Sequence, residues 1–286
     1  MRNDIRAITK EREAIEAPGI RDIASRIRTM TVEVLRAVRT GAPLAQAIRR
    51  HDEGIIDVLT DGKVASHLTG EARSQRAAKS RIEPAQSLAL PNVYRSTLRI
   101  AQARVGAPDA RIRSLVNVYK PQATEAVLRA QEALERKLTA ALAESIAEGD
   151  HVKRGIFRMR SAMTDAGVSL AAPFLYETLY RTELQLSYSA GRLTALSDPA
   201  IQSILWGFEY VAIPDARLRP NHAALDGLKL PQDDPQWATI MPPNGFNCRC
   251  SFIEIFNDEK PDEADVVPPE GFADKGFEFN PLTVLQ

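Results

Sequence analysis

The sequence predicts an α+β fold with a mainly helical N-terminal region and a small α+β C-terminal domain. Through most of residues 1–165, apolar side chains recur at three- and four-residue steps, as on one face of a helix. After Pro199 the period changes to two, which is typical of strands. Residues 258–286 are acidic, rich in proline and poor in large apolar side chains. We therefore expect a helical region over residues 1–165, a small domain over residues 166–257 and a flexible acidic tail over residues 258–286.

Two amphipathic patterns open the helical region. The first covers residues 20–38 and ends at the Gly-Ala-Pro sequence of residues 41–43. The second covers residues 44–59, and the Asp-Gly pair at residues 61–62 supplies a turn that ends it. Residues 71–81 are polar and short of large apolar side chains, so either a loop or an exposed helix is expected there.

Two further helices are expected after residue 120. Pro121 suits the first turn of a helix, and apolar residues then recur down to Gly149. Pro173 opens the next helix, which stops before the Ser-Asp-Pro sequence at residues 197–199. Both helices are therefore bounded by residues that favour helix starts and ends.

Two strands are expected in the C-terminal domain. Alternating apolar and other residues over 206–212 indicate a strand that ends at Pro214. A second strand is expected over residues 250–256. The segments between them are short and rich in Pro, Asn, Asp and Gly, which favours a small α+β unit packed on helices.

The composition indicates a soluble globular protein. Charged residues make up 26% and hydrophobic residues 44% of the 286 residues, which excludes a chain disordered throughout. The sequence has neither a run of about 18 apolar residues nor an apolar N-terminal signal, so we expect no membrane partner and synthesis in the cytoplasm. The 2 cysteines are separated by one residue and are expected to be thiols or ligands, not a disulfide framework.

The two halves of the chain carry opposite net charge. Residues 1–160 contain 29 Lys and Arg against 19 Asp and Glu, and residues 161–286 contain 8 against 18. Such an asymmetry can mark two surfaces with different partners, including nucleic acid on the basic side. We favour the other interpretation, that many of these charges cover the solvated faces of helices.

Four short stretches of the second half stand in a recognisable order. They are Arg181-Thr182-Glu183, then Asp215, Arg217, Arg219, His222, Asp226 and Gly227, then Pro242-Pro243, and last Asn247-Cys248-Arg249-Cys250. Together they resemble the phage Mu F-like family of head morphogenesis proteins, whose pattern runs from an Arg-Thr-Glu helix through an Asp-x-Arg-x-Arg-x-x-His turn and a Gly to Pro-Pro-x-x-x-Asn-Cys-Arg-Cys. The resemblance covers about residues 173–256, and it departs from the commonest pattern at Leu218 and at Gly245-Phe246.

This resemblance implies a minor head protein of a tailed bacteriophage. Such a protein is present in few copies in the virion, at the portal vertex or inside the head, and acts in procapsid assembly or in genome delivery through DNA ejection. The implied partners are the portal protein and the procapsid shell or scaffold, with docking by the helical region of residues 1–165. For the basic half, non-specific contact with packaged DNA is the alternative to docking.

His222, Cys248 and Cys250 are the best metal-ligand types in the motif. Two strand residues separated by one position point to the same face, so the two cysteines can act together. Zinc prefers four tetrahedral ligands, and Asp226, Asp215 or water would have to supply the fourth. The sequence therefore permits a structural zinc site, and no other cofactor is expected. The alternative is two buried free thiols beside a hydrogen-bonded histidine.

The remaining motif residues suit a structural ion-pair network. Arginine presents a planar fork of donors that matches carboxylates. An enzyme is the alternative, in which His222 and Glu183 process a nucleic acid or nucleotide by acid–base chemistry. The sequence has no Gly-rich phosphate loop, no paired-carboxylate metal motif and no Gly-x-Ser-x-Gly elbow, so we assign no catalytic residue. The expected network consists of Arg181, Glu183, Asp215, Arg217, Arg219, Asp226, Gly227, Asn247 and Arg249.

Overall fold

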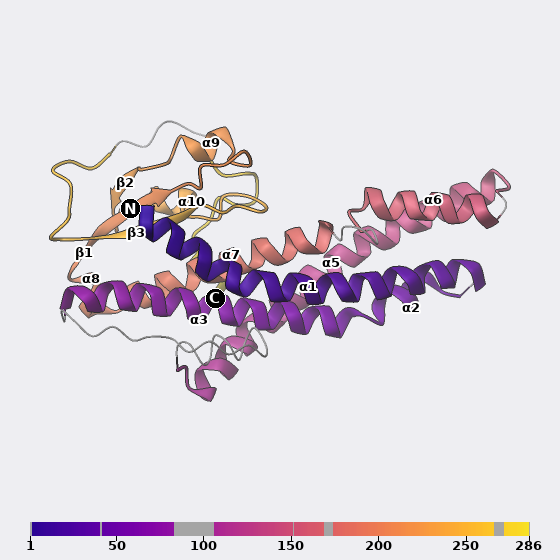
Figure 1. Ribbon diagram of the computed structural model, residues 1–286, viewed down its shortest axis with the longest axis horizontal. Coiled ribbons are helices and arrows are strands. Elements are labelled where there is room, and N and C mark those ends of the chain that lie inside the picture. The colour runs from indigo at the N-terminus through magenta and orange to yellow at the C-terminus, as the bar shows by residue number, and fades with distance from the viewer. Residues whose placement is uncertain are drawn as a thin grey trace. The chain divides into compact units, whose positions relative to one another are not determined.

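The computed structural model describes residues 2–40, 42–82, 106–150, 152–168, 174–265 and 272–285, and it confirms the predicted α+β class (Figure 1). The longer helices are α1 (Arg2–Thr40), α3 (Asp52–Ile82), α5 (Asp109–Ala147), α6 (Val152–Asp165) and α7 (Phe174–Leu196). The shorter helices are α2 (Leu44–Arg49), α8 (Pro199–Gln202), α9 (Pro220–Ala223), α10 (Trp237–Ile240) and the 3-10 helix η1 (Pro281–Leu285). None of the helices in these ranges is long and apolar enough to cross a membrane.

The chain forms two compact units that are each discontinuous in sequence. The sheet unit consists of Met1–Glu16, Lys63–Ile112 and Arg181–Gln286, and the helical unit consists of Ala17–Gly62 and Arg113–Tyr180. This division differs from the boundaries expected at residues 165 and 257. Periodicity indicates which residues form a helix but not which helices pack together, so the sequence did not reveal that α1, α3, α5 and α7 each contribute to both units.

A three-stranded antiparallel sheet lies at the centre of the sheet unit. Its order is β2 (Lys229–Pro231), β1 (Leu205–Val211), β3 (Ser251–Phe256), with Phe208 opposite both Leu230 and Glu254. The two predicted strands are confirmed as β1 and β3. Strand β2 has only 3 residues, too few to give an alternating pattern in the sequence.

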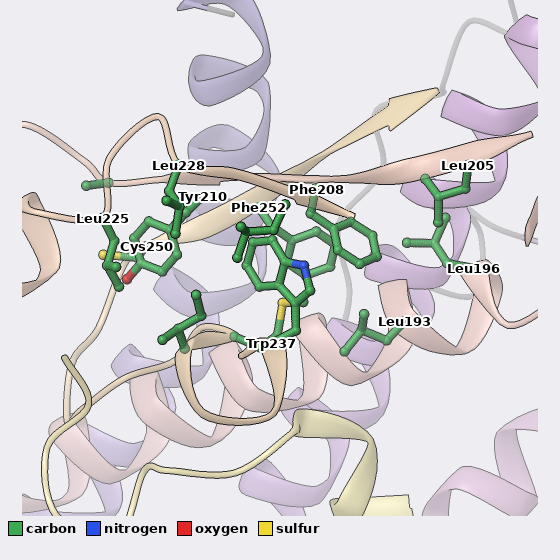
Figure 2. Packing of buried hydrophobic residues seen from close by; sticks show 14 of the residues in the cluster. Leu193, Leu196, Leu205, Phe208, Tyr210, Leu225, Leu228, Trp237, Cys250 and Phe252 are labelled. Carbon is green, nitrogen blue, oxygen red and sulfur yellow. The ribbon is translucent and has the colours of Figure 1, made fainter. Parts of the chain in front are cut away.

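The core of the sheet unit packs between the sheet and α7. Phe208 meets Trp237 and Phe252 edge to face, with ring centroids 5.5 and 5.2 Å apart, and such pairs contribute about 0.5–1.5 kcal/mol each beyond burial. The indole Nε1 of Trp237 donates to the carbonyl oxygen of Pro231 at 2.9 Å. Figure 2 shows these rings among Leu193, Leu196, Leu205, Tyr210, Leu225, Leu228 and Cys250.

Helices α3 and α7 cross with their backbones in contact. An ideal Cβ added to Gly191 would lie 1.9 Å from the carbonyl oxygen of His67, and one added to Gly70 would lie 2.2 Å from that of Tyr188. The Ser66 hydroxyl donates to the carbonyl oxygen of Leu184 at 2.7 Å. Only glycine fits where two helices approach so closely.

The contact between α3 and α7 explains why the helix end predicted at residues 61–62 was wrong. We expected a helix to end at residues 61–62, but α3 continues through them to Ile82, because residues 62–70 are all buried. Burial of this segment outweighs the local preference of Asp-Gly for a turn. Residues 71–81 are helical, so the helix is the correct one of the two alternatives there. The helix expected over residues 44–59 is instead divided between α2 and α3.

The helix start predicted at Pro121 was also wrong. Helix α5 begins at Asp109, so Pro121 lies inside it and not in its first turn. Proline inside a helix removes a hydrogen bond, but the nearby Tyr119, Ala123 and Val127 are fully buried and keep the segment helical. The end of α5 is as predicted, with Gly149 at φ 65° just beyond it. Helix α7 also ends as predicted, whereas Pro173, expected to open it, lies outside the described residues.

The predicted tail contacts the sheet unit over its described residues. Phe277 is 8% exposed and meets Phe246 edge to face at 5.0 Å. The backbone N–H of Asp274 donates to the carbonyl oxygen of Asn244 at 2.8 Å. The backbone N–H of Lys229 donates to the side chain of Asp265 at 2.7 Å. A few aromatic and acidic side chains therefore attach a segment whose composition alone predicts flexibility.

The buried His67 predicts a loss of stability in mild acid. Burial and the nearby Arg111 guanidinium lower the pKa of His67 to about 3, although Glu71 lies 3.8 Å from its Nε2. In the unfolded chain the pKa is about 6.5, so between these values only the unfolded state binds the proton. Stability is therefore full above about pH 6.5 and falls as the pH drops towards 3, by about 2 kcal/mol between pH 7 and 5. Urea unfolding at each pH measures this change.

Two variants separate His67 from the other histidines. His67→Gln is expected to remove most of the slope between pH 7 and 5. His51→Gln is expected to retain it, because His51 is only half-buried and lies 3.3 Å from Glu33. A wild-type stability that does not change over this range would refute the prediction.

Candidate functional site

His222, Cys248 and Cys250 meet in the interior of the sheet unit. His222 lies on the short helix α9, which begins at Pro220, and the two cysteines immediately precede β3. All three residues are buried, with exposed fractions of 2%, 3% and 2%. The His222 Nδ1 lies 3.7 Å from the Cys248 Sγ and 3.6 Å from the Cys250 Sγ. The structure thus brings together the three side chains that the motif singled out.

The surroundings of Cys248 and Cys250 shift the pKa values of their thiols in opposite directions. A hydrogen bond from the Cys250 thiol lowers the pKa of Cys248 well below its usual value, and His222 adds to this effect against the opposing effect of burial. The same hydrogen bond and burial raise the pKa of Cys250. Cys248 therefore loses its proton more readily than Cys250.

The backbone that carries the cysteines is held by helix α7. Asn247 adopts φ 55°, and its N–H donates to the Thr182 hydroxyl at 3.0 Å. The side chain of Gln185 donates to the carbonyl oxygen of Cys250 at 2.8 Å. Thr182, in the middle of the Arg-Thr-Glu sequence, thus orients the cysteine segment, a role that the sequence analysis did not assign. Hydroxyl and amide side chains three positions apart on a helix share a face, which was the available signal.

Arg181 and Glu183 contact neither the cysteines nor the other motif residues in any described interaction. The Arg181 Nη1 lies 3.0 Å from Glu16 of α1, and Glu183 lies 2.5 Å from the buried Lys63 of α3. Each of these two side chains thus has a partner outside the motif. Successive residues of a helix point about 100° apart, so the neighbours of Thr182 face different partners.

Asp215 and Arg249 form a bidentate ion pair at the surface. Both oxygens of Asp215 accept from the Arg249 guanidinium, whose side chain is 24% exposed. This hydrogen bonding, with help from the backbone N–H of Arg217, lowers the pKa of Asp215. The Arg217 side chain is 72% exposed and lies 3.7 Å from the same carboxylate. The pair connects the turn after β1 to the cysteine segment.

Asp226, Gly227 and Arg219 support the surrounding turns. The Asp226 carboxylate accepts from the backbone N–H of Ala212 at 2.8 Å, and Gly227 adopts φ 84°, where glycine is favoured. The Arg219 guanidinium donates to the carbonyl oxygen of Phe246 at 2.8 Å and lies 3.5 Å from Asp274. These residues are structural, but they act as separate pairs.

The sequence analysis missed the most buried ion pair of the sheet unit. Arg192 of α7 and Glu254 of β3 are 0% and 4% exposed and lie 2.7 Å apart. Ser74 of α3 donates to the same carboxylate, and Arg192 also donates to the carbonyl oxygen of Phe252 at 2.6 Å. A charged residue within the apolar strand Ser251–Phe256 was the signal that could have revealed it.

The fold and this site define a class of largely helical proteins in which a small three-stranded sheet carries a buried His–Cys–Cys cluster. Residues 136–253 match the model of the family described as Phage Mu protein F like protein. This match covers the motif residues and supports the Phage Mu F-like family that the motif indicated.

Two curated relatives match the chain. The "Putative capsid assembly protein F" of Escherichia phage Mu is 39% identical over 83 residues, which are 29% of this chain and 18% of that protein. The "Mu-like prophage FluMu F protein" of Haemophilus influenzae is 37% identical over 83 residues, 29% of this chain and 20% of that protein. The chain thus spans about a fifth of the length of these relatives. No solved structure matches it significantly.

Proposed function

We propose that the protein is a minor head protein of a tailed bacteriophage and acts in assembly of the procapsid. The match of residues 136–253 to the Phage Mu F-like family carries this proposal, and the name of the phage Mu relative supports it. After synthesis in the host cytoplasm the protein joins the virion, in few copies, at the portal vertex or inside the head. There it binds portal protein and shell or scaffold, and it contributes to genome delivery.

A helical hairpin in the helical unit supports docking. Helix α6 lies antiparallel to α5, because Arg158 pairs with Glu144 at 2.7 Å and Lys137 donates to the carbonyl oxygen of Asp165 at 2.7 Å. On this hairpin Ile146 is 72% exposed and Phe157 69% exposed. Exposed large apolar side chains on a helical surface are suited to burial against a partner protein. We propose that this α5–α6 hairpin contacts the portal protein.

Co-purification from infected cells tests this role. The tagged full-length chain is expected to retain portal protein of the same phage. Ile146→Ser and Phe157→Ser together are expected to reduce the retained portal at least about tenfold, because truncating buried contact residues costs about 1–2 kcal/mol or more each. Val32→Ser is the control, since Val32 is 50% exposed on α1, outside the hairpin.

The possible outcomes test the head role, the docking to portal protein and the α5–α6 contact separately. Retention of shell or scaffold without portal supports the head role and refutes portal docking. Retention of no head component by the unmodified chain refutes the head role itself. Equal loss of portal with Val32→Ser refutes the assignment of the contact to the α5–α6 hairpin.

The DNA-binding alternative has less support from the charges. Many basic side chains of the N-terminal half are paired with carboxylates in the described residues, which lowers the positive charge available to phosphates. Filter binding at two salt concentrations tests the alternative, since counterion release makes DNA binding fall steeply with salt. The pairs include Arg49–Glu135, Arg73–Glu11, Arg76–Glu11, Arg81–Asp258, Arg154–Asp150 and Arg158–Glu144.

The geometry does not favour the enzyme alternative either. His222 is buried beside two sulfurs, and Glu183 is held by Lys63. In the described part of the chain no hydrogen bond or ion pair joins His222 to Glu183. We therefore propose a non-catalytic role, and comparison of the wild type with His222→Ala on RNA and DNA substrates tests it.

A further inference from the structure

The ligand atoms of His222, Cys248 and Cys250 lie close enough together to bind a single ion. A zinc ion binds imidazole nitrogen at about 2.0–2.1 Å and thiolate sulfur at about 2.3 Å, so tetrahedral angles place the nitrogen and sulfur about 3.5–3.6 Å apart. The observed separations from Nδ1 are 3.7 and 3.6 Å. All three ligand atoms lie within 4.8 Å of one another. From this geometry we propose that these residues bind one zinc ion.

The chemistry of the donors supports zinc over other divalent ions. Thiolate and imidazole ligands suit zinc, whereas calcium and magnesium require oxygen ligands. The chain contains 2 cysteines in 286 residues, and both lie in this cluster. Zinc binds cysteine as the thiolate, so binding releases thiol protons, and the two thiolates balance the charge of the ion.

Surrounding backbone groups are placed as in a metal site. The backbone N–H of Asn244 donates a hydrogen bond to the Cys248 sulfur, as backbone amides do for metal-bound thiolates. The Thr182 hydroxyl accepts from the Asn247 N–H and the Gln185 side chain donates to the Cys250 carbonyl oxygen, and these hydrogen bonds hold the cysteine segment so that both sulfurs face His222. The site is thus organised by helix α7 before any ion binds.

A water molecule completes the coordination. Among the described residues no further His, Cys, Asp or Glu joins the cluster. Asp226 accepts from the backbone of Ala212 and Asp215 pairs with Arg249, so neither is directed to the ion. A cavity of about 20 Å³ borders His222 and both cysteines. A water needs about 10–15 Å³, so the cavity is large enough for one.

The ion has a structural role. It connects α9, in the segment between β1 and β2, to the segment that leads into β3. These two segments are also joined by the surface pair of Asp215 and Arg249 and by the hydrogen bond from Arg219 to the carbonyl oxygen of Phe246. Zinc bound by such segments contributes directly to folding stability.

Metal analysis of the purified full-length chain tests the proposal. Under reducing conditions, plasma mass spectrometry is expected to find close to one zinc per chain. Cys248→Ser and Cys250→Ser are each expected to lower the zinc content at least about tenfold, because each removes a ligand. His51→Gln is the matched control and is expected to keep the full zinc content, since His51 lies in the helical unit beside Glu33.

A second measurement needs no variant. Cobalt added to metal-free wild-type chain is expected to give the visible bands of a tetrahedral ion with sulfur ligands, and to protect both thiols from a thiol reagent. A chain that carries no zinc, gives no cobalt spectrum and leaves both thiols reactive would overturn the proposal, as would full zinc content in both serine variants. The proposed head function does not depend on zinc, and portal co-purification reports on it separately.

Discussion

Replacing Arg192 by methionine is expected to lower the free energy of unfolding by about 3–5 kcal/mol, because Glu254 then stays charged and buried without its partner. Both side chains are almost fully buried, and their charged atoms lie 2.7 Å apart. The change also removes the bond from the guanidinium to the carbonyl oxygen of Phe252. Urea unfolding at pH 7, followed by circular dichroism, measures the loss.

Two comparisons make this result specific. Arg249→Met removes the same kind of pair at the surface, where such pairs contribute about 0–1 kcal/mol. Arg192→Met combined with Glu254→Leu is expected to recover much of the loss, because no charge is left unpaired. If Arg192→Met and Arg249→Met cost the same, burial does not decide the effect and the argument fails.

The same pair affects acid unfolding. Burial opposes the charge on Glu254, but attraction to Arg192 and hydrogen bonds from Arg192 and Ser74 outweigh it, so the pKa of Glu254 is lowered. Because the folded pKa lies below the unfolded one, the stabilisation is present above the unfolded pKa and is lost as the pH falls through the folded pKa. The double variant therefore loses less stability than the wild type below about pH 4.3.

The second large effect is expected for Gly191→Ala. The added methyl group would lie 1.9 Å from the His67 carbonyl oxygen and 2.6 Å from its carbon, so α3 and α7 must separate. Overpacking costs about 1–3 kcal/mol or more, whereas alanine gains about 1 kcal/mol over glycine in a helix. Because the obstructing atoms belong to the backbone and cannot move away, overpacking outweighs the gain in helix propensity. We expect the free energy of unfolding to fall by about 2 kcal/mol. Urea unfolding measures it.

Gly54→Ala is the control for helix propensity. Its Cβ would meet only the guanidinium group of the flexible Arg26 side chain, with Nη1 at 2.0 Å, and this group can move away. We expect this variant to be neutral or to gain up to about 1 kcal/mol. Similar stability changes in the two variants would show that the helix crossing is not as tight as the structure indicates.

Local chemistry made part of the fold predictable. The ends of α5 and α7 followed from Gly149 and from residues 197–199, and alternation predicted β1 and β3. The two wrong predictions, a helix end near Gly62 and a helix start at Pro121, concern segments whose structure depends on residues distant in the sequence. Nothing near Gly62 indicates that the following residues will be buried against α7, and nothing near Pro121 indicates that its neighbours will be core residues.

The candidate site, too, could be predicted only in part. The motif identified His222 and the two cysteines as a group, because their chemistry is rare in the chain. It did not show that Arg181 pairs with Glu16, 165 residues earlier, or that Arg192 pairs with Glu254. Ion-pair partners depend on which helix faces meet, and a single sequence does not contain that information.

The interleaved order of the sheet unit has a consequence for how the chain acquires its structure. Arg12 donates to the carbonyl oxygen of Arg249, 237 positions away, and Ser74 donates to Glu254, 180 positions away. Contacts of such long range form late and slowly. During synthesis on the ribosome, α1 and the second half of α3 can therefore make these contacts only after β3 has been synthesised. A fragment that begins at residue 136 would lack α1 and α3 and would expose the surfaces that these helices cover in the whole chain. The segment shared with the family is thus not expected to be an autonomous folding domain in this chain.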